Sequence, residues 1–241
     1  VPAGPMMSGL SNVKKSAVRK AYARGEVSRS DLLKAEGEAY HSPGTCTFFG
    51  TANSNQMLME VMGLHLPGSS FVNPTDELRL GLTIAATERV VEISRRSNNP
   101  MPIGKMLDER SFVNAIIGLH ATGGSTNHTL HLPAMAAAAG IKLTWQDFSD
   151  LSEITPLLAR VYPNGDADVN HFHAAGGMAF VINQLLDAGL LDGTAKTVWG
   201  ESLFDYTKEP MFSDKKIIWK NGEKKSGDFE VLRPTSNPHS V

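Results

Sequence analysis

Residues 111–139 read SFVNAIIGLHATGGSTNHTLHLPAMAAAA, and this stretch sets the architecture of the chain. Phe112, Ile116 and Leu119 recur at helical spacing in its first half, and Thr126 to Ala139 resume as a helix rich in Ala and Leu. Gly123-Gly124 interrupts the two helices. Because the second helix has no broad polar face, we expect it to be buried between other elements.

Helical periodicity extends outward from this stretch in both directions. It predicts helices over residues 14–24, 31–40, 56–62 and 178–190. Another helix is expected to begin at Asn73-Pro74, because Asn is a strong N-cap and Pro is tolerated in the first turn. One face of that helix would carry Leu82, Ala86, Val90 and Ile93. Strands are fewer, with residues 141–145 and 216–220 as short candidates, so the chain is expected to be a helix-rich α/β protein.

The composition is ordinary for a globular protein of one large or two small domains. The 241 residues include 41% hydrophobic and 20% charged residues, and the net charge is −2. This balance offers no basic charge for non-specific nucleic-acid binding. No apolar run reaches the roughly 20 residues that span a bilayer, and no secretory signal is recognisable. We expect a cytoplasmic protein with no nucleic-acid or membrane partner.

Cys46 is the single cysteine of the chain. A single cysteine excludes an internal disulfide and fits a reducing compartment. It precedes a predicted helix, and a thiolate near a helix N-terminus is favoured as a nucleophile or metal ligand. The alternative is a cysteine that only fills the core. One thiolate cannot hold a zinc ion or an iron–sulfur cluster alone, so a cluster would need further ligands outside this chain.

The segment Ala121-Thr122-Gly123-Gly124-Ser125-Thr126-Asn127 is a glycine hinge that leads into a helix. Backbone N–H groups and the positive end of the helix dipole at such a start can bind an anion. The segment matches neither the P-loop nor the dinucleotide-binding pattern. The alternative is a simple elbow between two helices, capped by Ser or Thr.

Other polar clusters are weaker candidates. His128 and His131 share a helix face but have no third ligand in view. His171 and His173 lack helical ligand spacing and are expected to act as caps or packing groups. Residues 166–170 resemble the start of an EF-hand loop but fail at the required glycine and at the closing acidic position. Asp108-Glu109 is best explained as compensation of a helix dipole.

Several motifs, in this order, resemble the dehydratases of dihydroxy acids and sugar acids. The match runs along nearly the whole chain. The form of the cysteine motif favours the phosphogluconate branch, because the dihydroxy-acid branch typically has two glycines directly after this cysteine. The segments that carry the resemblance are Val1-Pro2-Ala3-Gly4-Pro5-Met6, residues 43–56 (PGTCTFFGTANSNQ), Pro67-Gly68-Ser69-Ser70-Phe71, residues 121–128 (ATGGSTNH) and Ala174-Ala175-Gly176-Gly177.

The resemblance implies a lyase that removes water from a 2,3-dihydroxy acid, a small-molecule sugar-acid phosphate in the phosphogluconate branch, and leaves a 2-keto-3-deoxy acid. Its cofactor would be an iron–sulfur cluster of the 4Fe-4S type, with 2Fe-2S as the alternative. The cluster would be held by three cysteines, of which Cys46 is the last. An open iron position would act as a Lewis acid on the leaving hydroxyl. A base would remove the proton next to the carboxylate.

The resemblance also implies that much of the site lies outside this chain. The other two cysteines would precede Val1, and the ligands of a Mg²⁺ ion would also lie outside this chain. The serine base would follow Val241, so no catalytic residue is expected here. Ser125 and Asn127 are expected to contact substrate. The fold would be a helix-rich portion of a three-layer α/β/α N-terminal dehydratase domain over residues 1–230, with 231–241 as a linker.

Two further expectations concern assembly and rival functions. We expect a homodimer, in which the Ala-rich helix is one candidate interface. The nearest rival activity is that of another sugar-acid or dihydroxy-acid dehydratase with the same chemistry. A rival of another class is a non-catalytic sugar-phosphate-binding or assembly domain, whose binding would be independent of iron and of the cysteine.

Overall fold

The computed structural model describes residues 10–39, 46–213 and 216–240. The elements are mainly helical, which confirms the helix-rich α/β class. In chain order they are α1 (Asn12–Ala23), α2 (Arg29–Glu38), α3 (Thr51–Val61), α4 (Glu77–Glu92), α5 (Ile103–Met106), α6 (Glu109–Thr122), α7 (His128–Ala138), α8 (Trp145–Ile154), α9 (Val169–Ala174), α10 (Gly177–Asp187), the 3-10 helix η1 (Leu203–Thr207), β1 (Lys208–Ser213) and β2 (Lys216–Asn221). Within the described ranges, no helix is long and apolar enough to cross a lipid bilayer.

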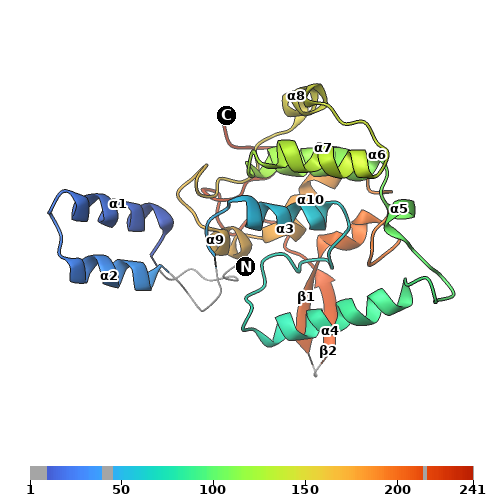
Figure 1. The fold of residues 1–241 in the computed structure, drawn as a ribbon, viewed down its shortest axis with the longest axis horizontal. Helices are drawn as coiled ribbons and strands as arrows, with labels where there is room; N and C mark the ends of the chain where they lie inside the picture. The colour runs from blue at the N-terminus through green and yellow to red at the C-terminus, as the bar shows by residue number, and fades with distance from the viewer. Residues whose placement is uncertain (1–9, 40–45, 214–215, 241) are drawn as a thin grey trace.

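Helices α1 and α2 form a hairpin at one side of the molecule (Figure 1). Ser28 and Asp31 start α2 with a reciprocal capping box, in which each side chain binds the other residue's backbone N–H. Arg19 on α1 donates through Nη2 to Glu36 on α2 (2.8 Å). The two helices expected here are confirmed, apart from Tyr40, which lies outside the described residues.

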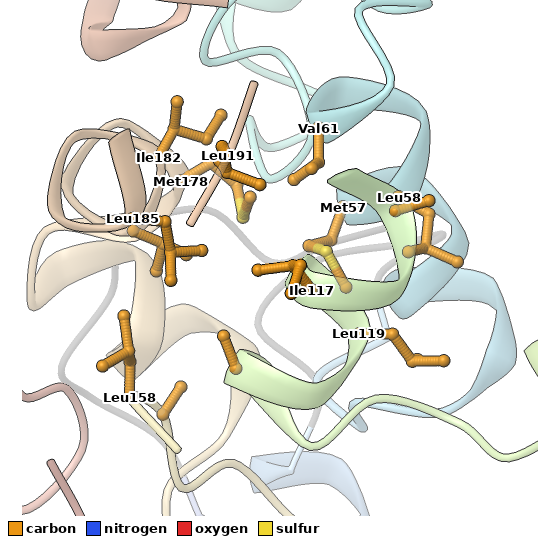
Figure 2. Close-up of a cluster of buried hydrophobic side chains, with 14 of the residues drawn as sticks. Met57, Leu58, Val61, Ile117, Leu119, Leu158, Met178, Ile182, Leu185 and Leu191 are labelled. Atoms are coloured by element: carbon orange, nitrogen blue, oxygen red, sulfur yellow. The ribbon is translucent and has the colours of Figure 1, made fainter. Parts of the chain in front are cut away.

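The hydrophobic core lies between α3, α6 and α10. Figure 2 shows apolar side chains from these helices gathered around a common centre. The residues labelled there are all buried: Met57, Leu58, Val61, Ile117, Leu119, Leu158, Met178, Ile182, Leu185 and Leu191. All but Leu158 and Leu191 lie on the three helices, and burial of these large side chains is the main source of stability for this part of the chain.

Helices α3 and α6 approach each other closely at Gly118. A Cβ atom at this position would lie 3.2 Å from both Cγ atoms of Val61 and 3.5 Å from Met57 Sδ. The absence of a side chain therefore lets α3 lie directly on α6. The first turn of α3 is thereby held near the end of α6, where the chain turns toward α7.

The Ala-rich helix α7 forms as expected, but the expectation that it is buried is wrong. Leu132 and Ala136 are fully buried, whereas Leu130 is 66% exposed. Along this helix only one face contacts the core, and the other presents Ala and Leu to the surface. An alanine-rich sequence has almost no polar–apolar contrast, so its periodicity cannot show which face is covered.

Helix α4 begins later than expected. Its N-cap is Asp76, whose Oδ1 accepts a hydrogen bond from Leu78 N (2.9 Å). Asn73 instead accepts one from Thr75 N (2.9 Å) and so forms a turn before the helix. On the face expected for this helix, Leu82 is buried but Val90 is 62% exposed.

The strand expected over residues 141–145 is absent from the described structure. Residues 141–144 form no strand pairing and lead directly into α8. Thr144 and Asp147 start that helix with a capping box. The run of Ile, Lys, Leu and Thr resembled a strand because alternation over so few residues cannot distinguish a strand from a helix entry.

The strand expected at residues 216–220 is confirmed as β2. It pairs antiparallel with β1, in a register that runs from Lys208↔Asn221 to Ser213↔Lys216. The hairpin packs against α4, and the two lie together in Figure 1. Gly81 permits this contact, since a Cβ there would lie 2.6 Å from Ile217 Cδ1.

Residues 231–240 run beside residues 157–160. Arg160 N donates to Val231 O (2.9 Å), and Arg233 N donates to Leu158 O (2.8 Å). Val231 and Leu232 are buried. The division into a domain over 1–230 and a linker over 231–241 stays a prediction.

Glu60, in the last turn of α3, is completely buried and anchors the loop that follows this helix. Its carboxylate accepts hydrogen bonds from Gly68 N (2.6 Å), Ser70 N (3.2 Å) and Ser70 Oγ. Burial away from water raises the pKa of Glu60 to about 7, although these donors act in the opposite direction. Gly68 has a φ of +69°, which an L side chain rarely adopts, so the loop geometry depends on this glycine.

We predict a pH-dependent contribution of Glu60 to stability. The folded chain keeps its proton up to about pH 7, whereas the unfolded chain releases it near pH 4.5. In this window the unfolded state binds fewer protons, so stability falls as the pH rises. Relative to Glu60→Gln, the wild-type free energy of unfolding should fall by about 3 kcal/mol between pH 4.5 and 7. Urea unfolding at several pH values measures this difference, with the exposed Glu153→Gln as the control. A constant difference across the window would contradict it.

Candidate functional site

Cys46 lies at the start of the segment that leads into α3, and the backbone around it is held from two sides. The Asn53 side chain donates from Nδ2 to Cys46 O (2.9 Å) and to Phe48 O (2.8 Å). On the other side, Val169 N donates to Thr47 O (2.9 Å). Cys46 itself is half-buried, and its thiol is free. The sulfur is therefore partly accessible on a fixed piece of backbone, unlike a cysteine that only fills the core.

A second anchor behind Cys46 is the carboxylate of Asp168. Asn12, at the start of α1, donates from Nδ2 to Asp168 Oδ1 (3.0 Å) and to Thr47 Oγ1 (2.8 Å). Asp168 is 1% exposed and also caps α9. Its partner in that cap is His171, whose Nδ1 accepts a hydrogen bond from Asp168 N (3.0 Å). The expected capping role of His171 is thus confirmed.

The first turns of α3 and α7 meet through three polar side chains. Asn127 Nδ2 donates to Thr51 Oγ1 (2.6 Å), and Thr51 Oγ1 and Ser125 Oγ lie 2.8 Å apart. Ser125 Oγ also accepts a hydrogen bond from Asn127 N (3.3 Å). Ser125 and Asn127, which the sequence indicates as substrate contacts, are therefore neighbours in space and share Thr51 as a partner. Thr51 belongs to the same short segment as Cys46.

A buried serine–histidine pair, Ser54 and His128, lies next to this cluster and contacts Ser125. Ser54 Oγ and His128 Nε2 lie 2.8 Å apart, and Ser125 N donates to Ser54 Oγ (3.3 Å). His128 is 1% exposed, and its Nδ1 is a buried atom without a hydrogen-bond partner. Burial, and to a lesser extent the nearby His131, lowers the pKa of His128 to about 4. At neutral pH the ring is uncharged and serves to hold Ser54 and the elbow in place.

The chemistry of this cluster is that of a binding surface for oxygen-rich or anionic groups. It offers two hydroxyls and one amide at the N-terminal ends of two helices of 11 residues each, where the dipoles favour negative charge. Neither helix has a side-chain cap on its own first turn. The cluster itself contains no carboxylate and no cationic side chain, so it can bind and orient a ligand but cannot supply a strong acid or base.

The structure tests how far these residues fit a metal cofactor. Within the described residues, no group of three or more His, Cys, Asp or Glu side chains is arranged to hold a metal ion. His128 and His131 have ring centroids 5.6 Å apart, but no third ligand joins them. Cys46 fits the role of one ligand, since its thiol is partly accessible and not in a disulfide. The described part of the chain can contribute one donor to a cluster but cannot hold it alone.

Three residues of the site were missed by sequence reasoning. Thr51, Asn53 and Ser54 all lie in the segment after Cys46, where the sequence pattern assigns no separate role to any of them. Ser125 and Asn127 both contact Thr51, which lies 74 and 76 positions earlier in the sequence. No local pattern reveals such a contact. Parts of the quoted motifs, residues 1–6 and 43–45, lie outside the described residues.

We predict that Thr51 and Asn127 are energetically coupled. Thr51→Val removes the hydroxyl at nearly constant shape, and Asn127→Ala removes the donor. A double-mutant cycle by urea unfolding should give a coupling energy of about 0.5–1.5 kcal/mol. Thr51→Val combined with the distant Ser152→Ala is the control and should be additive. Additivity in both cycles would mean that the two first turns are not joined through Thr51.

We also predict that His128 makes the protein less stable in acid. The folded state keeps this ring neutral down to about pH 4, whereas the unfolded chain takes up the proton near pH 6.5. The unfolded state therefore binds more protons in this window, and stability is lost as the pH falls through it. Relative to His128→Gln, the wild type should lose up to about 3 kcal/mol between pH 6.5 and 4. Chemical unfolding across this range gives the answer, and parallel pH profiles would refute it.

Comparison of the sequence with those of known proteins assigns the chain to a family. Residues 1–206 match the family described as dihydroxy-acid/6-phosphogluconate dehydratase, N-terminal. Over the whole chain, the sequence is 55% identical to the phosphogluconate dehydratase of Pseudomonas aeruginosa. Over 240 residues it is 54% identical to that of Escherichia coli K12. A dihydroxy-acid dehydratase of Caldicellulosiruptor saccharolyticus is 32% identical over 246 residues.

The alignments also show how much of these relatives the chain represents. It spans about 40% of the length of the Pseudomonas and Escherichia proteins and 42% of the Caldicellulosiruptor protein. The family match covers the half-buried Cys46, the first turn of α3 and the elbow with Ser125 and Asn127. The chain belongs to the N-terminal family of the dihydroxy-acid and 6-phosphogluconate dehydratases.

Proposed function

We propose that this chain is part of a hydro-lyase that dehydrates 6-phospho-D-gluconate to 2-dehydro-3-deoxy-6-phosphogluconate, the reaction of the Entner–Doudoroff pathway. The observation that carries the proposal is the contrast in identity. The phosphogluconate dehydratases of Pseudomonas aeruginosa and Escherichia coli K12 are 55% and 54% identical over essentially the whole chain, whereas a dihydroxy-acid dehydratase of Caldicellulosiruptor saccharolyticus is 32% identical. The chain alone is expected to be inactive, because the base is expected outside it and the described residues form no complete site for a metal cofactor.

Within this reaction, Cys46 is proposed as one of three cysteine ligands of an iron–sulfur cluster. Its half-buried thiol and doubly anchored backbone suit a ligand that must not move. When bound, the cluster supplies a Lewis acid for the hydroxyl that leaves. We expect the 4Fe-4S form, with 2Fe-2S as the alternative, and Mg²⁺ bound by residues outside this chain. Asn53 is the positioning residue, since its side chain donates hydrogen bonds to the carbonyls of Cys46 and Phe48.

Ser125 and Asn127 are proposed to bind oxygen atoms of the substrate. Both lie at helix N-terminal ends, where a carboxylate or phosphate is stabilised by the dipole and by side-chain donors. Thr51 holds the two side chains in one orientation, so little conformational freedom is lost when substrate binds. The neutral His128 and Ser54 keep the elbow rigid without adding charge. The base is expected outside this chain.

The ligand role of Cys46 is testable in the full-length enzyme. Cys46→Ser should lower dehydration of 6-phosphogluconate by at least about 100-fold, because an alkoxide is a poor substitute for a thiolate on iron. Iron per protein and the visible absorbance of the anaerobic enzyme should fall in parallel. Ser152→Ala, an exposed hydroxyl on α8, is the control. Full iron content with undiminished activity would remove Cys46 from the cluster.

The binding role of the elbow predicts a separate kinetic signature. Ser125→Ala and Asn127→Ala should each raise KM for 6-phosphogluconate about tenfold, as expected for the loss of one hydrogen bond to a charged group. Iron content should not change. Thr126→Ala is the matched control, since this exposed residue lies between the two. Equal KM values for all three variants would show that substrate does not contact the elbow.

A substrate panel distinguishes the remaining alternatives. Faster turnover of a dihydroxy acid or another sugar acid would favour the related dehydratases. Binding of 6-phosphogluconate that survives removal of iron, without any turnover, would favour a non-catalytic binding or assembly domain. A homodimer and a cytoplasmic location are further expectations of the same proposal.

A further inference from the structure

The short segment from Cys46 to Phe48 is held at three consecutive carbonyls. Asn53 Nδ2 donates to Cys46 O (2.9 Å) and to Phe48 O (2.8 Å). Between them, Thr47 O accepts a hydrogen bond from Val169 N (2.9 Å). The Cys46 sulfur itself lies 3.9 Å from Phe48 O, a carbonyl that Asn53 holds. The position of the sulfur therefore depends on how firmly this segment is fixed.

Asn12, the first residue of α1, adds a side-chain anchor to the same segment. Its Nδ2 donates to Thr47 Oγ1 (2.8 Å) and to Asp168 Oδ1 (3.0 Å), and these partners are 35 and 156 positions away in the sequence. Both hydrogens of the amide are thereby used. Because Thr47 is fixed at its carbonyl by one element and at its hydroxyl by another, the peptide unit between Cys46 and Thr47 has little freedom to rotate.

Asp168 is the fixed end of this contact. It is 1% exposed, and a buried carboxylate needs hydrogen-bond donors in place of water. Asn12 supplies two of them, because its backbone N also donates, to Asp168 Oδ2 (3.2 Å). The backbone of Asp168 is held in turn, since Asp168 N donates to His171 Nδ1 (3.0 Å). The carboxylate therefore fixes the start of α1 against the start of α9, and Asn12 extends this link to Thr47.

We propose that Asn12 is a second positioning residue for Cys46. It acts through Thr47, which it joins to the buried Asp168, and so keeps the neighbouring Cys46 sulfur in one place. A ligand that is already in place loses less conformational freedom when it binds a metal, and residues that orient ligands commonly raise metal affinity. This inference rests on the proposed function, in which Cys46 binds an iron–sulfur cluster. It adds the α1–α2 hairpin to the elements that support the cofactor site.

The first test measures the Cys46 thiol in the full-length protein without its cofactor. Asn12→Ala removes both side-chain hydrogen bonds, and Thr47→Val removes only the hydroxyl at nearly constant shape. Each should raise the rate at which iodoacetamide alkylates Cys46 by about five- to tenfold, the effect of one lost hydrogen bond on a local opening equilibrium. Thr47→Ser keeps the hydroxyl and should react at the wild-type rate. Mass spectrometry of the Cys46 peptide gives the rates, and Thr47→Val carries the test where Asn12→Ala does not fold.

A control variant separates positioning from a general loss of stability. Thr144→Ala removes the capping box at the start of α8 and should lower the urea midpoint of the protein. It should leave the alkylation rate of Cys46 unchanged, because it touches neither Asn12 nor Thr47. If Thr144→Ala and Asn12→Ala both accelerated alkylation in proportion to the stability that they lose, Asn12 would have only a structural role and the proposal would be overturned.

The second test uses the anaerobic enzyme with its cofactor. Asn12→Ala and Thr47→Val should release iron to a chelator about tenfold faster than wild type, with KM for 6-phosphogluconate unchanged. Wild-type rates of alkylation and of iron release, in an enzyme whose Cys46→Ser variant still loses iron, would overturn the positioning role and leave the proposed function intact. Full retention of iron by Cys46→Ser would instead overturn the proposed function, and the positioning role with it.

Discussion

The close packing of α3 on α6 is the constraint on which the rest of the structure depends. Gly118 allows Val61 and Met57 to lie directly against α6, and the buried faces of both helices join the core with α10. Each end of α3 then positions a neighbouring segment. Its first turn orders the Cys46 segment and the elbow after α6, and its last turn orders the following loop through Glu60. A shift of α3 would disturb both ends at once.

The same arrangement explains why two ionisable groups are buried beside one helix. Glu60 lies in the last turn of α3, and His128 contacts Ser54 of the same helix; burial favours the neutral form of each. Their contributions to stability have opposite pH dependence, so they partly cancel between pH 4.5 and 6.5. Neither group is proposed to act on substrate. Glu60 accepts hydrogen bonds from the loop after α3, and His128 contacts the Ser54 hydroxyl beside the elbow. Cys46 is the group proposed to bind the cofactor, and Ser125 and Asn127 are the groups proposed to bind substrate.

Much of the fold could be predicted from the sequence, because helical periodicity and caps are local signals. The expectation for α7 was wrong because Ala-rich sequence has no polar face to read, and Asn73 was mistaken for the cap that Asp76 provides. The roles of Cys46, Ser125 and Asn127 stay predictions, although the structure does bring Ser125 and Asn127 into one cluster through Thr51. Thr51, Asn53 and Ser54 were missed, since their partners are remote in sequence and only the packing of α3 beside the elbow brings them together.

The central claim is that the segment around Cys46 and the elbow with Ser125 and Asn127 form one wall of the dehydratase site. A structure of the full-length protein, prepared without oxygen and with 6-phosphogluconate bound, tests this claim most directly. The account predicts iron bonded to Cys46 Sγ and substrate oxygens within about 3 Å of the Ser125 and Asn127 side chains. A cluster held by other cysteines, or substrate bound away from the elbow, would contradict it.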